Sequence, residues 1–221
     1  MQKVLLLLII FSLVELTKAQ TKGQMQLGME FGPDQSEIYG SPAPINKSYT
    51  GAYALGFTAQ YDFNEIFSLK SGIYNEVKGF SQSYSYVSNP ASQTPFVSYI
   101  NYNGLDYITI PLLMKAGFGR KLHCFANAGP YLGWLVGAPA SQEYTDSLIK
   151  RQTSTGNAAN LYKAVDFGVA GGAGIEIQLK NRFILSLEAR YNLGLVNIDN
   201  SGFYNIKNES TDLLFGVRYR L

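Results

Sequence analysis

Eight stretches of the chain alternate apolar residues with polar or very small ones. In the first stretch the apolar positions are Met25, Leu27, Met29 and Phe31. A repeat of two residues is that of a β-strand with one apolar and one polar face. The eight stretches are residues 24–31, 52–63, 66–79, 106–118, 122–136, 165–179, 183–193 and 212–221. The pattern therefore predicts an all-β fold.

The connections between these stretches predict how the strands are arranged. Three connections are short, and four are long: residues 33–49, 80–105, 137–161 and 196–207. Outer-membrane barrels combine short periplasmic turns with long external loops, and their closure leaves no unpaired strand edge in the lipid. We therefore expect an eight-stranded antiparallel transmembrane β-barrel, an up-and-down meander with its long loops outside.

The alternation alone also fits a soluble eight-stranded barrel that is apolar inside and polar outside. Two features favour the membrane barrel. The polar face is rich in Gly and Ala, which suits a crowded interior. The aromatic residues of the apolar face cluster near the strand ends, as in the two girdles of membrane barrels.

The first nineteen residues have the layout of a secretory signal peptide. Lys3 precedes the apolar residues 4–14, and Thr17-Lys18-Ala19 forms a small-residue cleavage site before Gln20. The apolar stretch is shorter than the roughly 20 residues that a spanning helix needs. The sequence thus predicts a signal peptide at residues 1–19 and one barrel domain at residues 20–221.

Charge and cysteine content exclude several functions. Basic and acidic residues nearly balance, so no strong field exists to attract nucleic acid. Cys124 is the only cysteine, and strand parity places it on the apolar face, where it gives no redox or metal role. We expect no cofactor and no metal.

The charged residues of the polar face predict a buried network. Buried charges persist when they are paired, so these residues are interpreted as structural ion pairs rather than as a proton or ion path. Antiparallel pairing should bring Arg218 and Arg220 near Glu188, with Glu176 as a second anion. The predicted network is Glu176, Glu188, Arg190, Arg218 and Arg220. A general porin is not expected, because side chains largely fill an eight-stranded barrel.

No catalytic constellation is visible in the sequence. The only histidine, His123, begins a strand at a short turn, far from every long loop, and is interpreted as a ring near the lipid headgroups. The long loops instead carry tyrosines among Ser, Asn and Gln, a composition typical of binding loops. The alternative is that these rings only lie near the headgroups. The candidate contact residues are Tyr84, Tyr86, Tyr99, Tyr102, Tyr144 and Tyr204.

Several segments resemble the PorT-like outer-membrane β-barrel family of Bacteroidota. The most specific are Asp106-Tyr-Ile-Thr-Ile-Pro-Leu-Leu-Met-Lys115 and Ala128-Gly-Pro-Tyr-Leu-Gly-Trp134, and the closing Leu214-Phe-Gly-Val-Arg-Tyr219 agrees. The resemblance implies an eight-stranded barrel in the outer membrane of a Gram-negative bacterium. The member that gives the family its name belongs to the type IX protein-export machinery. Barrels of this kind commonly end in an aromatic residue, whereas this sequence ends in Leu221.

Three functions remain open at this point. The first hypothesis is a non-enzymatic outer-membrane barrel whose external loops bind a protein or glycan. The alternatives are an accessory component of type IX secretion and, more weakly, an enzyme that modifies outer-membrane lipid. The expected partners are outer-membrane lipid, the barrel-assembly machinery and a loop-bound protein or glycan, but not nucleic acid.

Overall fold

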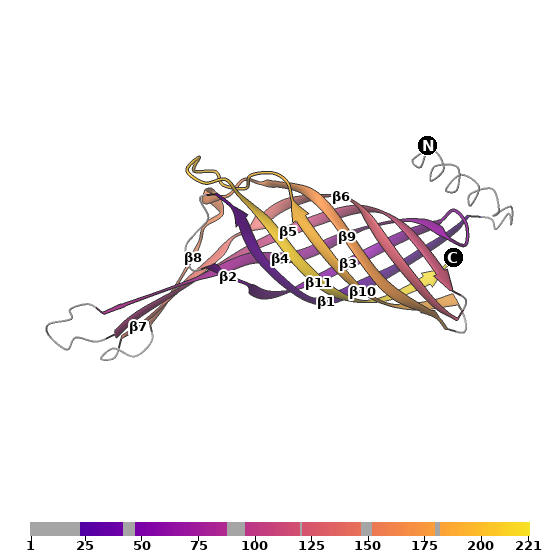
Figure 1. Ribbon diagram of the computed structural model, residues 1–221, viewed down its shortest axis with the longest axis horizontal. Coiled ribbons are helices and arrows are strands. Elements are labelled where there is room, and N and C mark those ends of the chain that lie inside the picture. The colour runs from indigo at the N-terminus through magenta and orange to yellow at the C-terminus, as the bar shows by residue number, and fades with distance from the viewer. Residues whose placement is uncertain (1–22, 42–46, 88–95, 120, 147–151, 180–181) are drawn as a thin grey trace, which may run out of the picture.

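The computed structural model describes residues 23–41, 47–87, 96–119, 121–146, 152–179 and 182–221. Within them, eight strands form a closed antiparallel ring in the order β1-β3-β4-β5-β6-β9-β10-β11 and back to β1 (Figure 1). These strands are β1 (Gln24–Gly40), β3 (Thr50–Asp62), β4 (Phe67–Val87), β5 (Phe96–Gly119), β6 (Leu122–Gly137), β9 (Val165–Gln178), β10 (Phe183–Gly194) and β11 (Ile206–Arg220). The predicted eight-stranded barrel is confirmed. The predicted signal peptide lies outside the described residues.

The connections divide the barrel into two ends. The short β3–β4, β5–β6 and β9–β10 connections lie at one end, the turn end, beside the C-terminus (Figure 1). The long connections lie at the opposite end, the loop end. Asn64 holds the first short turn, because its side-chain carbonyl accepts hydrogen bonds from the amides of Ile66 and Phe67, both at 2.8 Å.

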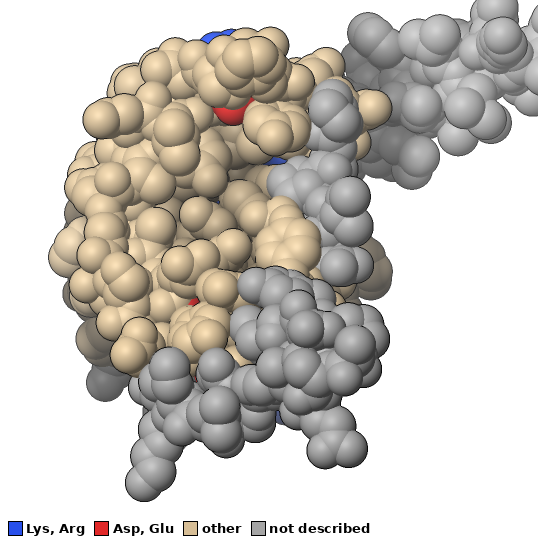
Figure 2. Space-filling view, turned by 90° about the vertical axis from the view of Figure 1, so that its left-hand side faces the viewer, with Lys and Arg blue, Asp and Glu red and all other residues tan. Residues whose placement is uncertain are grey.

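The outward face of the strands is apolar, as the alternation predicts. Figure 2, which looks at the molecule from the left-hand side of Figure 1, shows few Lys, Arg, Asp or Glu atoms on the described surface. Along β1, Met25, Leu27, Met29 and Phe31 are exposed, while the residues between them face the interior. Aromatic rings pair near the turn end, where Phe183 and Tyr219 lie 5.2 Å apart in an edge arrangement. Beyond Pro33 the outward positions of β1 become polar at Gln35, which marks the loop-end limit of the apolar belt.

The described residues include no helix that is long and apolar enough to cross a membrane.

Glycines on the inward face make room for large interior rings. A Cβ atom at Gly56 would overlap the ring of Tyr74, and one at Gly168 would overlap that of Tyr131. Both tyrosines are almost completely buried in the lumen. The Gly-rich polar face therefore reflects a packed interior, as expected from the sequence.

A cluster of apolar side chains closes the loop end of the lumen. Its members are Ile38, Phe80, Leu105, Tyr107, Ala138, Ile198 and Ile206, and we call it the apolar plug. The β10–β11 connection folds inward to contribute Ile198, whose amide donates to the carbonyl of Ile206 at 2.8 Å. A short 3₁₀ turn, η1 (Ala159–Leu161), packs against the plug from the other side.

The largest departure from the sequence prediction lies beyond the plug. Residues 80–105 and 137–161 were expected to be loops, yet β4 and β5 continue as a paired hairpin to Val87 and Phe96. Three further strands join them: β2 (Lys47–Ser48), β7 (Pro139–Asp146) and β8 (Gln152–Asn157). We call this β2-β4-β5-β7-β8 assembly, beyond Phe80 and Asn103, the protruding sheet (lower left in Figure 1). The sequence does not predict this sheet, because its strands lack an apolar side and therefore show no alternation of apolar and polar residues.

Candidate functional site

The middle of the lumen holds a dense set of ion pairs. Lys70 Nζ lies 2.6 Å from Glu30 Oε1 and 2.7 Å from Glu188 Oε2. Arg190 bridges the same two acids, at 2.8 Å from Glu188 Oε1 and 3.3 Å from Glu30 Oε2. The Tyr74 hydroxyl donates to Glu30 at 2.7 Å. Each of these side chains is at most 1 % exposed, so the charges depend on one another for stabilisation.

A second set of charges lies closer to the turn end. Glu176 pairs with both Lys115 and Arg218, and Arg218 also reaches Glu30 at 3.4 Å. Arg218 therefore links the two sets of ion pairs. Arg220 lies at the rim, where it donates to the side-chain carbonyl of Gln178 at 3.3 Å.

The structure brings most of the predicted network together but with different partners. Glu176, Glu188, Arg190 and Arg218 are all buried in the lumen. The ion pairs of Glu188 run to Lys70 and Arg190, whereas Arg218 pairs with Glu176 and Glu30. Alternation along residues 66–79 puts Lys70 on the polar, inward face. It does not tell which inward residues meet across the barrel. That pairing depends on the stagger between strands.

The loop-end half of the lumen is less well paired. Asp34 and Asp212 are directly opposite each other on β1 and β11, and both are almost fully buried. Both carboxylate oxygens of Asp34 lack a hydrogen-bond partner among the described residues, as does Oδ1 of Asp212. The nearby cation Lys78 instead lies 3.3 Å from Glu76 and 3.7 Å from Asp166.

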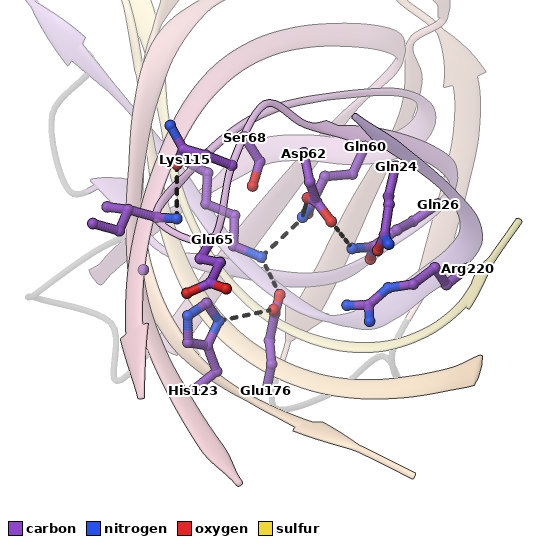
Figure 3. Close-up of a pocket in the computed structure, with 13 residues that line it drawn as sticks. Gln24, Gln26, Gln60, Asp62, Glu65, Ser68, Lys115, His123, Glu176 and Arg220 are labelled. Carbon is purple, nitrogen blue, oxygen red and sulfur yellow. Dashed lines mark hydrogen bonds and ion pairs between the residues drawn. The ribbon is translucent and has the colours of Figure 1, made fainter. Parts of the chain in front are cut away.

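A cavity of about 250 Å³ opens at the turn end of the lumen. Figure 3 shows Lys115, Glu176 and His123 on one side of it and the side chains of Gln26, Gln60 and Asp62 on the other. The polar groups of the wall bond to one another. Asp62 accepts hydrogen bonds from Gln26 at 2.6 Å and from Gln60 at 2.7 Å.

His123 does not lie against the headgroups, as the sequence had suggested. Its ring turns into the cavity, with Nδ1 3.8 Å from Glu176 Oε2 (Figure 3). The predicted placement at the short-turn end is correct, but the residue faces inward because it is paired with Glu176 across β6 and β9. Among the described residues, no group of three or more His, Cys, Asp and Glu side chains could hold a metal ion.

The protruding sheet carries a second candidate site, on the face that continues the inner wall of the barrel. Strand register places Tyr84, Tyr99 and Tyr144 in one row across β4, β5 and β7. The rings of Tyr99 and Tyr144 lie 5.0 Å apart. A second row, one step nearer the barrel, consists of Gln82, Asn101, Gln142 and Ser154. Two shallow hollows of about 330 and 370 Å³ lie along this face.

The other predicted contact tyrosines lie elsewhere. Tyr102 follows Asn101 on β5 and therefore belongs to the opposite face of the protruding sheet. Tyr204 is exposed in the β10–β11 connection. Tyr86 lies near the tip of β4, and its side chain is outside the described set. The structure thus places three of the six candidates in one row. The sequence does not indicate their amide neighbours, because residues 80–105 and 137–161 lack the alternation that predicts a strand.

Comparison with known proteins identifies the family. Residues 18–200 match the model of the outer membrane protein beta-barrel domain, so the chain belongs to that family and to the bacterial outer membrane. No curated protein sequence matches the chain.

Several solved structures are similar at low sequence identity. Ail of Yersinia pestis, solved in complex with the heparin analogue sucrose octasulfate, is 10 % identical over 89 % of this chain and 99 % of its own, with a TM-score of 0.41. OprG of Pseudomonas aeruginosa is 12 % identical over 90 % and 96 %, with a TM-score of 0.44. Neisserial surface protein A is 14 % identical over 89 % and 97 %, with a TM-score of 0.41.

Proposed function

We propose that this protein is a non-enzymatic outer-membrane anchor that presents a recognition surface outside the cell. The observation that carries this proposal is the protruding sheet, which continues the barrel wall beyond the apolar belt. Its inner face exposes tyrosines and amides, the side chains that binding loops use to gain contact area and hydrogen bonds. External long loops are the rule for outer-membrane barrels, so this sheet would face the surroundings.

The contents of the lumen support a binding role over transport. Its middle is occupied by mutually paired side chains, including Lys70, Glu188 and Arg190. The apolar plug lies across its loop end. A solute would have to displace both layers, at the cost of leaving buried charges unpaired.

Removing the protruding sheet tests the proposal. Phe80 is paired with Asn103, and Pro139 with Asn157, so each extension can be replaced by a two-residue turn. In this excision variant Asn-Gly replaces residues 81–102 and again residues 140–156. Cells displaying either protein are compared for retention on immobilised extracellular proteins and polysaccharides. We expect that only the cells displaying the intact protein are retained. Equal behaviour of the two proteins would contradict the proposal.

A second candidate is an accessory role in type IX secretion, and the turn-end cavity favours it. A periplasmic partner would meet this polar hollow, with Glu65, His123 and Arg220 at its wall. Deleting the gene and measuring the export of cell-surface proteins distinguishes the two. Impaired export, rescued by the excision variant, would favour the secretion role.

The lipid-modifying enzyme is the least supported alternative. His123 is the only histidine in the sequence, and it lies at the turn end, far from the loop end that would meet outer-leaflet lipid. Altered lipid A in cells that overexpress the protein would support this alternative.

A further inference from the structure

We propose that the inner face of the protruding sheet is a binding site for an uncharged oligosaccharide. This inference rests on the proposed recognition function and names its ligand class. It is carried by the two rows of side chains on that face, by the two hollows along it and by the uncharged character of the described residues that line those hollows.

The two hollows adjoin each other, because Gln142 and Ser154 line both. One is lined by Gln82, Asn101, Gln142 and Ser154 among others, and the other by Tyr99, Tyr144 and Gln152 together with the same Gln142 and Ser154. Each is of the size of a small-molecule pocket, roughly 300 to 1,000 Å³. An elongated ligand that crosses the strands would therefore contact the amide row and the tyrosine row together.

The amide row suits a ligand with many hydroxyl groups. A carboxamide offers both donors and an acceptor, and a sugar hydroxyl both donates and accepts. The amide of Gln142 donates to Asn101 Oδ1 at 3.0 Å, and that of Gln82 donates to the Tyr84 hydroxyl at 3.0 Å. These bonds fix the orientation of the amides before a ligand arrives, which lowers the entropy cost of binding.

The tyrosine row suits the other surface of a sugar ring. Pyranose rings have apolar C–H faces that pack against aromatic rings, and a tyrosine loses little conformational entropy when it is held in such a contact. Tyr99 and Tyr144 are half-exposed, and Tyr84 is 36 % exposed. The tyrosine hydroxyls add hydrogen-bonding groups at the edge of the same contact.

The uncharged lining of the two hollows disfavours ionic ligands. The described residues that line the two hollows are uncharged, and Glu143 belongs to the opposite face. Strand register places two charged residues at the margins of the face, with Lys47 opposite Gln82 and Asp146 opposite Val97. A sulfated or carboxylated glycan would need Lys or Arg partners to replace its hydration. An extended peptide is the competing ligand. Its backbone would pair with β8, the last strand in the order of the sheet.

The test uses the full barrel in lipid nanodiscs with defined oligosaccharides. The neutral probes are maltohexaose, cellohexaose, xylohexaose and mannohexaose, and the anionic probe is a heparin hexasaccharide. Binding is measured by calorimetry for the unmodified protein, Gln142→Ala, Tyr144→Ala and the control Ile100→Ala. Ile100 lies on β5 between Tyr99 and Asn101, so its side chain is on the opposite face. Gel mobility without heating checks that each variant has folded.

At least one neutral hexasaccharide is expected to bind, and the heparin fragment is not. Gln142→Ala and Tyr144→Ala should each weaken binding by about tenfold, and Ile100→Ala by less than about twofold. Binding of the heparin fragment alone, or equal loss in all three variants, would overturn the inference. If no hexasaccharide binds but the excision variant loses retention on a protein, the ligand class is wrong and the recognition function stands. If excision changes no retention, the recognition function itself fails.

Discussion

The lumen and the protruding sheet share the inner face of β4 and β5, but they carry opposite chemistry. On β4, Lys70 and Glu76 face the enclosed lumen, whereas Gln82 and Tyr84 continue the face beyond the plug. The lumen charges are about 1 % exposed and bind one another. The side chains of the tyrosine row and the amide row on the sheet are uncharged and at least partly exposed. Polar side chains enclosed in the lumen therefore stabilise the fold by pairing with one another. Polar side chains on the exposed sheet are accessible to a ligand.

The largest expected effect comes from breaking an enclosed ion pair. Glu188→Leu would deprive both Lys70 and Arg190 of a partner, and we expect it to lower the free energy of unfolding by about 3 to 5 kcal/mol. Glu143→Leu, the matched change on the protruding sheet, should cost less than roughly 0.5 kcal/mol. Urea unfolding of the refolded proteins measures both. Equal stability of the two variants would mean that water solvates the charges of the lumen.

The apolar plug should show the next largest effect. Ile198 is completely buried, although it belongs to a connection between strands. Ile198→Ala is expected to destabilise the protein by about 2 to 4 kcal/mol, through lost burial and the cavity left behind. The same unfolding measurement tests it. A cost near zero would show that the loop end of the lumen is open.

The two halves of the lumen should respond in opposite directions to loss of an acid. Asp34 faces Asp212 and has no hydrogen-bond partner among the described residues, so Asp34→Asn removes one of two facing buried acids that disfavour each other. We expect it to stabilise the barrel by about 1 kcal/mol. Glu30→Gln weakens contacts to Lys70, Arg190 and Arg218 and should destabilise it. If both changes destabilise equally, the contrast between the halves is wrong.

The smallest expected effect is a pH dependence confined to the β10–β11 connection. Burial alone would raise the pKa of Asp199, but hydrogen bonds from the Ser201 hydroxyl and from the amides of Tyr204 and Gly202 hold it below its usual range. A lowered pKa in the folded state contributes stability that is lost as the pH falls through it. Exchange of the Gly202 amide should therefore accelerate, relative to intrinsic exchange, as the pH falls below the ordinary pKa of an aspartate, about 4. Asp199→Asn should abolish this pH dependence.

The sequence predicted the barrel well because each spanning strand has one apolar and one polar face. The alternation of apolar and polar residues predicts the eight strands and their inward charges, such as Glu188. It also predicts the packed interior. The protruding sheet has no such contrast. Residues 81–85 read Ser-Gln-Ser-Tyr-Ser, so both faces are polar, and the strand forms through pairing with β5. Cross-barrel partners such as Lys70 and Glu30 also escaped prediction, because they depend on stagger between strands.

Unfolding of the excision variant tests most directly whether the lumen supplies the stability and the protruding sheet the function. Urea titration of the refolded variant, followed by tryptophan fluorescence from Trp134, is compared with that of the intact barrel. We predict free energies of unfolding that agree within roughly 1 kcal/mol, because the ion pairs and the plug remain in place. A loss of several kcal/mol would contradict the account, since the protruding sheet would then be part of the folded core.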